Sequence, residues 1–335
     1  MSYEPQFTIS PNLLTTVEEI ARLRQRIDDA SIEVPWIPAL QKDTRTRNAH
    51  ASTAIEGNPL TLAEVRALAD SPDGIGPVPR SNREVINYFA GLRYIEEHSA
   101  DPLVAEARLL EIHRILTNGV MEQGTEGEYR FIRVQVGAYR PPDPADVPRL
   151  MADLLEWWNG PSATFSPVIT SAVIHHRIET IHPFGDGNGR VGRAAALWEL
   201  YRRGFDTHSI FSIDEYYWED RPAYYAALAA AQTGGQDLTG WIEYSATGLK
   251  QTLERVWARI QLIGTSESER LVLRPKQERL LQLLGERGSM APAEIWEELG
   301  VSRQGAMDLL NPLLGAGLVE KVGTKKTGRY RLKAL

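Results

Sequence analysis

The chain has 335 residues, no cysteine and a formal net charge of −7 at pH 7. This length allows about two domains with cores of their own, and the lack of cysteine excludes a disulfide framework, a thiolate nucleophile and a zinc ribbon. The first residues do not combine a basic segment with an apolar run, and no uncharged apolar stretch approaches the length of a membrane span. We therefore expect a cytoplasmic protein that makes no membrane contact.

A helix is predicted over residues 36–56. Gly57 can close this helix, and Asn58-Pro59 prevents its continuation. Glu56 then lies at the C-terminal end, where the helix dipole disfavours an anion, so an arginine partner would relieve a poor placement. Taken alone, a solvated glutamate near a helix end is the simpler interpretation.

A short β-hairpin is predicted over residues 127–137. This segment alternates β-branched or aromatic residues with polar ones and leads into a proline-rich turn. Val134, Gln135 and Val136 lie in its second half. For any single residue here, an ordinary connecting hairpin is as good an interpretation as a docking role.

One helix is predicted on each side of a glycine-rich stretch, residues 182–193. Residues 167–181 carry apolar side chains at helical spacing and no glycine, so a helix runs into His182. Residues 191–203 are good helix formers, and Gly204 stops them. Between the helices, three glycines within five residues allow positive φ angles and aim successive N–H groups at one point. Because the turn leads into a helix N-terminus, it favours an anion.

The charged side chains of this stretch fit the handling of a nucleotide phosphate. Arg190 and Arg193 are three residues apart at the start of a helix and can both bind phosphate oxygens. Asp186 is a hard oxygen ligand suited to Mg²⁺. His182 is the nearby group whose ordinary pKa suits proton abstraction near neutrality. Phe184 is most simply an apolar anchor for the turn.

The stretch resembles the signature of the Fic (Fic/Doc) family, HxFx[D/E]GNGRxxR, with every specified position filled. The resemblance implies an enzyme that transfers AMP from Mg-ATP to a Ser, Thr or Tyr hydroxyl of a protein. It also implies that His182 is the general base and that Asp186 holds magnesium. The nucleotide phosphates would be bound by Gly187, Asn188, Gly189, Arg190 and Arg193. A kinase-like branch of the family has lysine at the position of Gly189, so nucleotidyl transfer is favoured here.

Residues 52–58 resemble the inhibitory pattern of the same family, [S/T]xxxE[G/N], with Ser52, Glu56 and Gly57 at its specified positions. The resemblance implies that Glu56 pairs with Arg193 and keeps it from the nucleotide. Since the pattern lies on the same chain as the signature, the inhibitor would be built in.

Two weaker resemblances concern substrate binding. The hairpin segment is similar to the family's flap, in which Val134, Gln135 and Val136 would hold the target by strand addition. Residues 224–228 are similar to the family element YYxAL, in which Tyr224 and Tyr225 would bound the nucleotide-base pocket. Helix aromatics are more often plain core.

The C-terminal part of the chain differs electrostatically from the rest. Residues 263–269 are the best linker candidate. From Arg270 onward there are 12 Lys or Arg against seven Asp or Glu, a balance of +5, which leaves −12 for residues 1–269.

Three helices and a basic hairpin are predicted in this part. The helices cover residues 276–285 and 293–299 and start again at Arg303 behind Ser302, with Pro312 bending or shortening the third. This order resembles a winged helix-turn-helix. A protein-binding or dimerising module and a solvated basic hairpin remain alternatives. The candidate DNA-binding residues are Arg303, Gln304, Lys325, Lys326 and Arg329.

We therefore expect an all-α Fic fold with a short β-hairpin flap over residues 1–262, an inhibitory region around 36–57, a linker over 263–269 and a small α+β winged helix-turn-helix domain over 270–335. The expected cofactors are ATP as substrate and Mg²⁺, and the expected partner is a target protein, with self-modification and homodimerisation left open. Removal of AMP from a protein, with Glu56 orienting water, is one alternative. A nucleotide-sensing transcription regulator that binds DNA is the other.

Overall fold

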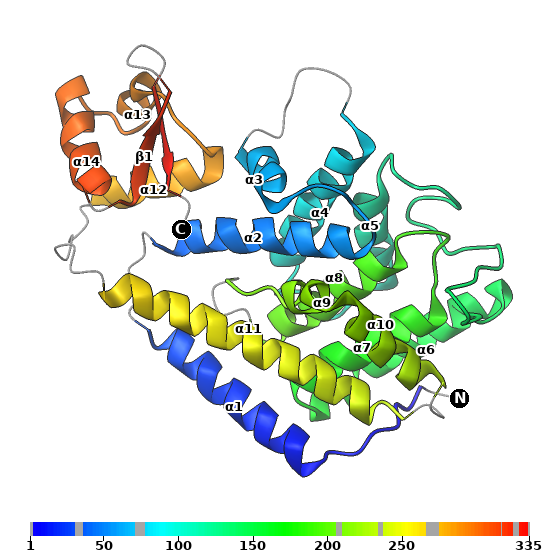
Figure 1. The fold of residues 1–335 in the computed structure, drawn as a ribbon. Helices are drawn as coiled ribbons and strands as arrows, with labels where there is room; N and C mark the ends of the chain where they lie inside the picture. The colour runs from blue at the N-terminus through cyan, green and yellow to red at the C-terminus, as the bar shows by residue number, and fades with distance from the viewer. Residues whose placement is uncertain are drawn as a thin grey trace.

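The computed structural model describes residues 3–30, 36–70, 78–205, 210–233, 237–265, 275–315, 317–323 and 328–333. This part of the chain is mostly helical (Figure 1). Up to residue 265 the helices are α1 (Pro11–Asp28), α2 (Trp36–Ile55), α3 (Leu62–Asp70), α4 (Arg80–Glu97), α5 (Glu106–Thr117), α6 (Val147–Asn159), α7 (Pro167–Ile181), α8 (Asn188–Arg202), α9 (Asp214–Glu219), α10 (Arg221–Thr233) and α11 (Thr239–Thr265), with 3₁₀ turns at Pro144–Asp146 and Pro161–Thr164. No helix in it combines the length and apolar character needed to cross a membrane.

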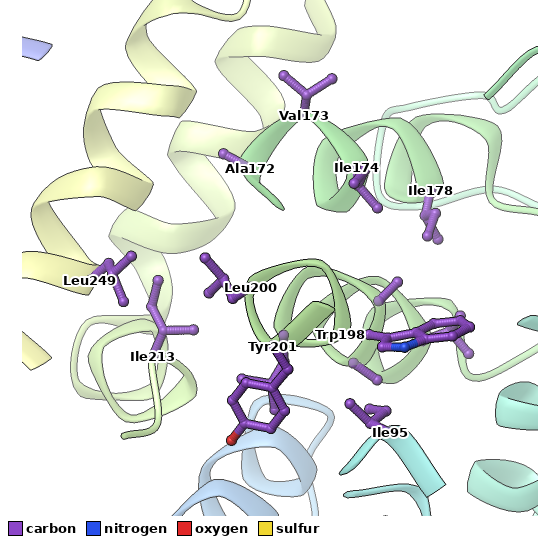
Figure 2. Packing of buried hydrophobic residues seen from close by; sticks show 14 of the residues in the cluster. Ile95, Ala172, Val173, Ile174, Ile178, Trp198, Leu200, Tyr201, Ile213 and Leu249 are labelled. Atoms are coloured by element: carbon purple, nitrogen blue, oxygen red, sulfur yellow. The ribbon is translucent and has the colours of Figure 1, made fainter. Parts of the chain in front are cut away.

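Helices α7 and α8 pack together and form the centre of the larger core. Of their 15 residues each, 12 in α7 and 13 in α8 are buried, as expected for helices surrounded by others. Figure 2 shows Ile174 and Ile178 of α7 facing Trp198 of α8. Around this pair, α1 packs along α11, and α2 packs against α4 and α9 (Figure 1). The turn between α7 and α8 is therefore held by the most buried elements of the fold.

The helix bounds next to the glycine-rich stretch follow from local chemistry. Ser166 caps α7 by accepting a hydrogen bond from the Val168 N–H, and Pro167 occupies the first turn. The prediction of a helix over residues 167–181 is confirmed. The second helix begins at Asn188, three residues earlier than the predicted run of helix formers.

The predicted hairpin over residues 127–137 is wrong in its extent. In this described segment the structure has a single antiparallel bridge, between Val136 and Tyr139, and no strand. Arg130 explains the difference, because its N–H donates to the Pro183 carbonyl and its buried guanidinium donates to the carbonyls of His182 and Pro142. The alternating residues thus serve to anchor a loop beside the end of α7 instead of pairing with each other.

The C-terminal part contains α12 (Pro275–Arg287), α13 (Pro292–Glu298), α14 (Arg303–Gly315) and an antiparallel pair of strands, β1 (Val319–Val322) and β2 (Arg329–Leu332). Its buried side chains form a second cluster, separate from the larger core. Ser302 caps α14 as predicted, but the helix continues through Pro312 to Gly315, so the predicted shortening is wrong. Leu309, Leu310 and Leu313 are buried on both sides of the proline and offset its missing N–H.

Two further observations concern the connection between the parts. α11 runs to Thr265, three residues into the predicted linker, and residues 266–269 lie outside the described residues. α12 packs against α2, where a Cβ placed on Gly285 would lie 3.2 Å from Pro38 Cβ.

Candidate functional site

The turn between α7 and α8 is shaped by its own side chains. His182 ends α7 in the left-handed conformation, with φ 51°, and Gly187, with φ 80°, precedes α8. The Asn188 side chain accepts a hydrogen bond from the Phe184 N–H and donates one to the Phe184 carbonyl, both at 2.9 Å. The conformation of the turn is therefore fixed by groups within it.

His113 of α5 supports the same turn. Its ring stacks on Phe184, with 3.7 Å between centroids and 4° between planes. Nδ1 accepts a hydrogen bond from the Gly127 N–H at 2.9 Å, so Nε2 carries the proton and donates to the Asp186 carbonyl at 3.0 Å. Sequence reasoning missed His113 because these partners lie 14 and 73 residues away along the chain.

The N-terminus of α8 is covered by Glu56. A Cβ placed on Gly189 would collide with Glu56 Oε1, so the carboxylate lies against the first turn of the helix. Unpaired N–H groups and the positive end of the dipole favour an anion at this point. The place where the sequence predicts phosphate is thus taken by a carboxylate of the protein itself.

Arg193 is held in the same place by α2. Its guanidinium lies 2.8 Å from Glu56 Oε1 and donates to the Ser52 hydroxyl at 2.8 Å and to the Ser52 carbonyl at 2.9 Å. Tyr224 Oη lies 3.4 Å and Asp214 Oδ2 3.7 Å from it on the other sides. The Arg193 side chain is 1% exposed and that of Glu56 35%, so displacing Glu56 would open one side of a buried cation. Gly57, with φ 96°, ends α2 just after the glutamate.

Arg190, which is buried, and Asp186, which is partly exposed, pair beside the turn. Asp186 Oδ1 accepts a hydrogen bond from the Gly187 N–H at 2.6 Å and lies 3.4 Å from Arg190 Nη2. Arg190 Nε is buried and has no partner among the described residues, which leaves a donor for an incoming anion.

A magnesium ion fits the Asp186 carboxylate, whose side chain is 28% exposed. No group of three or more His, Asp or Glu that could hold a metal occurs among the described residues. Mg²⁺ often takes only one or two carboxylates and completes its shell with phosphate oxygens and water. Asp186 therefore suits an ion that arrives with a nucleotide.

The His182 ring is suited to accept a proton. Burial, as the largest cause, lowers the pKa of His182 to about 4, so the ring is neutral near pH 7. Arg130 Nε donates a hydrogen bond to the His182 carbonyl at 2.7 Å. Nδ1 is buried without a hydrogen-bond partner, and the Glu179 carboxylate lies 3.8 Å from it.

The two tyrosines of the predicted base pocket differ. Tyr224 is buried and stacks on Tyr217. Its hydroxyl forms a hydrogen bond with His175 Nε2 at 3.0 Å. That partner gives His175 a structural role. Tyr225 is 41% exposed and donates to the carbonyl of Ile55 at the end of α2. Of the pair, Tyr225 is the one with ring surface open to a ligand.

The predicted flap residues lie on the loop anchored by Arg130. Val136 is 39% exposed, and the Gln135 amide donates to the Gly137 carbonyl at 2.8 Å. Within the described residues, the main chain of Val134 and Gln135 makes no hydrogen bond to other main-chain groups.

The predicted DNA-binding residues differ in exposure and in the partners that they have. Arg303 is exposed at the start of α14, and Gln304 bonds Asp308 at 2.9 Å. Arg329 pairs with Glu294 at 2.8 Å, so its charge is not free for phosphate. Lys325 and Lys326 lie outside the described residues.

Comparisons with known sequences agree with this geometry. Residues 103–200 match the model of the Fic/DOC family. The chain is 30% identical over 251 residues to the "Protein adenylyltransferase Fic" of Culex quinquefasciatus, covering 74% of this chain and 47% of that protein. It is 31% identical over 224 residues to the "Protein adenylyltransferase fic-1" of Caenorhabditis elegans, covering 64% of this chain and 42% of that protein. The chain thus matches about half the length of these curated relatives.

Solved structures are similar as well. A Fic family protein from Desulfovibrio desulfuricans G20 matches with a TM-score of 0.69 and 28% identity over 99% of both chains. Fic-1 from C. elegans matches with a TM-score of 0.62 and 25% identity, covering 74% of this chain and 73% of that one. The first of these matches includes the C-terminal helices and strands.

Proposed function

We propose that this chain, which carries a Fic/DOC-family domain, is a protein adenylyltransferase that moves AMP from Mg-ATP to a Ser, Thr or Tyr hydroxyl. The observation that carries the proposal is the turn between α7 and α8, where a neutral imidazole, a helix N-terminus and two arginines converge within 12 residues. Phosphoryl-type transfer depends chiefly on such positioning and charge stabilisation. The chain spans 48% and 47% of the length of two of its curated relatives.

The proposed reaction assigns a role to each group. His182 takes the proton of the target hydroxyl, the oxygen bonds to the α-phosphorus, and the bond from that phosphorus to the bridging oxygen breaks, releasing pyrophosphate. Arg190 and the N–H groups of Gly187 to Gly189 bind the phosphates. Magnesium held by Asp186 would neutralise charge on the leaving group. The general base accounts for ~10²–10⁴-fold of the rate.

We further propose that Glu56 inhibits this reaction. Its carboxylate lies against the first turn of α8 and pairs with Arg193, and a nucleotide phosphate would need both. ATP then binds in a pose unfit for in-line attack until α2 moves. The same carboxylate is partly exposed, which suits the alternative role of orienting water for removal of AMP.

The proposed target site is the loop of Val134, Gln135 and Val136. The main chain of Val134 and Gln135 has no main-chain partner among the described residues, whereas Val136 bonds to Tyr139 through both its N–H and its carbonyl. Strand addition by a target segment would use the unpaired groups of Val134 and Gln135. Self-modification uses the same reaction. The proposed base pocket is bounded by Tyr225, with Tyr224 as the buried wall behind it.

For the C-terminal part we propose a winged helix-turn-helix over residues 270–335, joined to a catalytic domain over 1–262. The support is the order of α12, α13, α14 and a two-stranded sheet around a separate core. The pairing of Arg329 with Glu294 favours a protein-binding module over DNA binding. We propose a cytoplasmic protein.

Labelling with ATP carrying ³²P at the α position tests the function. The Glu56→Gly protein should place acid-stable label on protein, and Glu56→Gly with His182→Ala should place none. No label from the first protein, together with nucleotide-dependent retention on DNA, would instead support the transcription regulator.

A further inference from the structure

Glu179 is a buried acid that the mechanism above does not use. It lies on α7 one turn before His182 and is 8% exposed. Its Oε1 has no hydrogen-bond partner among the described residues, and Nδ1 of His182 has none either. Its Oε2 lies 3.8 Å from that Nδ1. A buried polar atom without a partner costs free energy, so a buried acid with one oxygen unpartnered and the other facing Nδ1 needs an explanation.

The packing of α8 confines the Glu179 carboxyl to this position. A Cβ placed on Gly192 would lie 3.1 Å from Glu179 Oε1 and 3.0 Å from His175 Cδ2. The absence of a side chain at Gly192 therefore makes room for the carboxyl between α7 and α8. A smaller apolar residue at 179 would fit the same space without any unpaired oxygen.

We propose that Glu179 is the positioning residue of the base, with its carboxylate facing His182 Nδ1. The inference rests on the proposed function. With a proton on Nδ1 directed at Glu179, Nε2 presents its lone pair to the target hydroxyl. When Nε2 takes the hydroxyl proton, the carboxylate stabilises the imidazolium, and Glu179 itself neither gains nor loses a proton. Against the larger effect of burial, the main-chain carbonyl of Glu179 also raises the pKa of His182, while the carboxylate contributes the charge.

The surroundings make this charge dependent on pH. Burial first, and then the Glu56 charge, raise the pKa of Glu179 to about 7, while Arg193 acts in the opposite direction. The carboxyl is therefore ionised above this range and neutral below it. The ionisable groups that act on the Glu179 and His182 side chains are Glu56, Arg130, Asp186, Arg193 and Tyr224.

The test is Glu179→Gln in the Glu56→Gly protein, because glutamine keeps the shape and removes only the charge. At pH 8 we expect kcat to fall ~10-fold or more, part of what a general base provides, with KM for ATP within about twofold. The loss should vanish as pH falls below the range in which Glu179 ionises, since carboxyl and amide are then both neutral. Glu179→Asp, which keeps the charge, should retain more activity than Glu179→Gln. Glu156→Gln, an exposed change on α6, is the matched control.

A kcat loss that is the same at every pH, or no loss at all, would overturn the proposal. A second readout does not need activity. The ring nitrogen resonances of His182, identified by comparison with His182→Ala, should shift as Glu179 ionises and lose that shift in Glu179→Gln. If the Glu56→Gly protein transfers no AMP to any protein, the proposed function fails. The ring nitrogen resonances of His182 still show whether its ring senses the charge of Glu179.

Discussion

Glu56 and Arg193 meet at the N-terminus of α8, 2.8 Å apart, although 137 residues separate them along the chain. Ser52, one turn earlier on α2, holds the same guanidinium through its hydroxyl and its carbonyl. α2 and the residue that directly follows it therefore supply these three contacts. Inhibition, in this account, is the occupation of a phosphate site by the protein's own carboxylate.

Ser52→Ala should activate the enzyme partly. It removes the hydroxyl that accepts from Arg193, a hydrogen bond to a charged group worth ~1.5–3 kcal/mol, and that also bonds to Asp214, and it leaves the Glu56 pair in place. The initial rate of AMP incorporation should lie between those of the parent and of Glu56→Gly. A rate equal to the parent's would show that Ser52 does not help to hold α2.

Asp186→Asn should raise the magnesium requirement. Asparagine can still accept the hydrogen bond from the Gly187 N–H but brings no charge to the ion. In the Glu56→Gly protein, the Mg²⁺ concentration for half-maximal rate should rise ~10-fold or more. Glu122→Gln, which changes a neighbouring carboxylate paired with Arg80, is the control and should leave that concentration unchanged. Equal magnesium dependence of the parent and Asp186→Asn would remove Asp186 as the ligand.

Phe184→Ala should destabilise the fold strongly. Phe184 is 0% exposed and stacked on His113, so truncation loses both burial and the ring contact. We expect the free energy of unfolding in urea to fall by ~3–5 kcal/mol. Phe131→Ala on the neighbouring loop removes a ring that is 75% exposed and should change it by less than ~0.5 kcal/mol. Similar losses for the two variants would contradict the anchoring role of Phe184.

Stability should fall as pH falls from about 6.5 toward 4. Burial lowers the pKa of His113, His176 and His182 to about 4 each, so at these three rings the unfolded chain binds more protons than the folded one across this window. Glu179, whose pKa burial raises to about 7, acts in the opposite direction, but it is one group against three. Each histidine contributes at most ~3 kcal/mol, all of it present above pH 6.5 and lost progressively below. Urea unfolding at pH 7 and pH 5 checks this, and His176→Gln should reduce the difference. A free energy that is constant between these values would refute the burial of neutral rings.

The residues of the turn could be predicted from the sequence because their constraints are local. Glycines, a helix on each side and the charged residues all lie within 12 positions, so backbone and chemistry agree without knowledge of the fold. The pairing of Glu56 with Arg193 needed the family resemblance, since nothing local joins α2 to α8.

The missed residues act through contacts distant in sequence. Arg130 and His113 bond to main-chain groups of the turn, and no periodicity marks such partners. Arg130 also explains why a strand-like pattern gave a loop. Glu179 did carry a signal, because it is the one acid on α7 and lies one turn before the base.

AMP transfer by this chain is tested most directly by mass spectrometry of lysate proteins incubated with the enzyme, ATP and Mg²⁺. We expect AMP adducts on Ser, Thr or Tyr with Glu56→Gly, far fewer with the parent, and none when His182→Ala is added. Equal adducts with and without the His182 ring, or no adduct even on the Glu56→Gly protein itself, would contradict it.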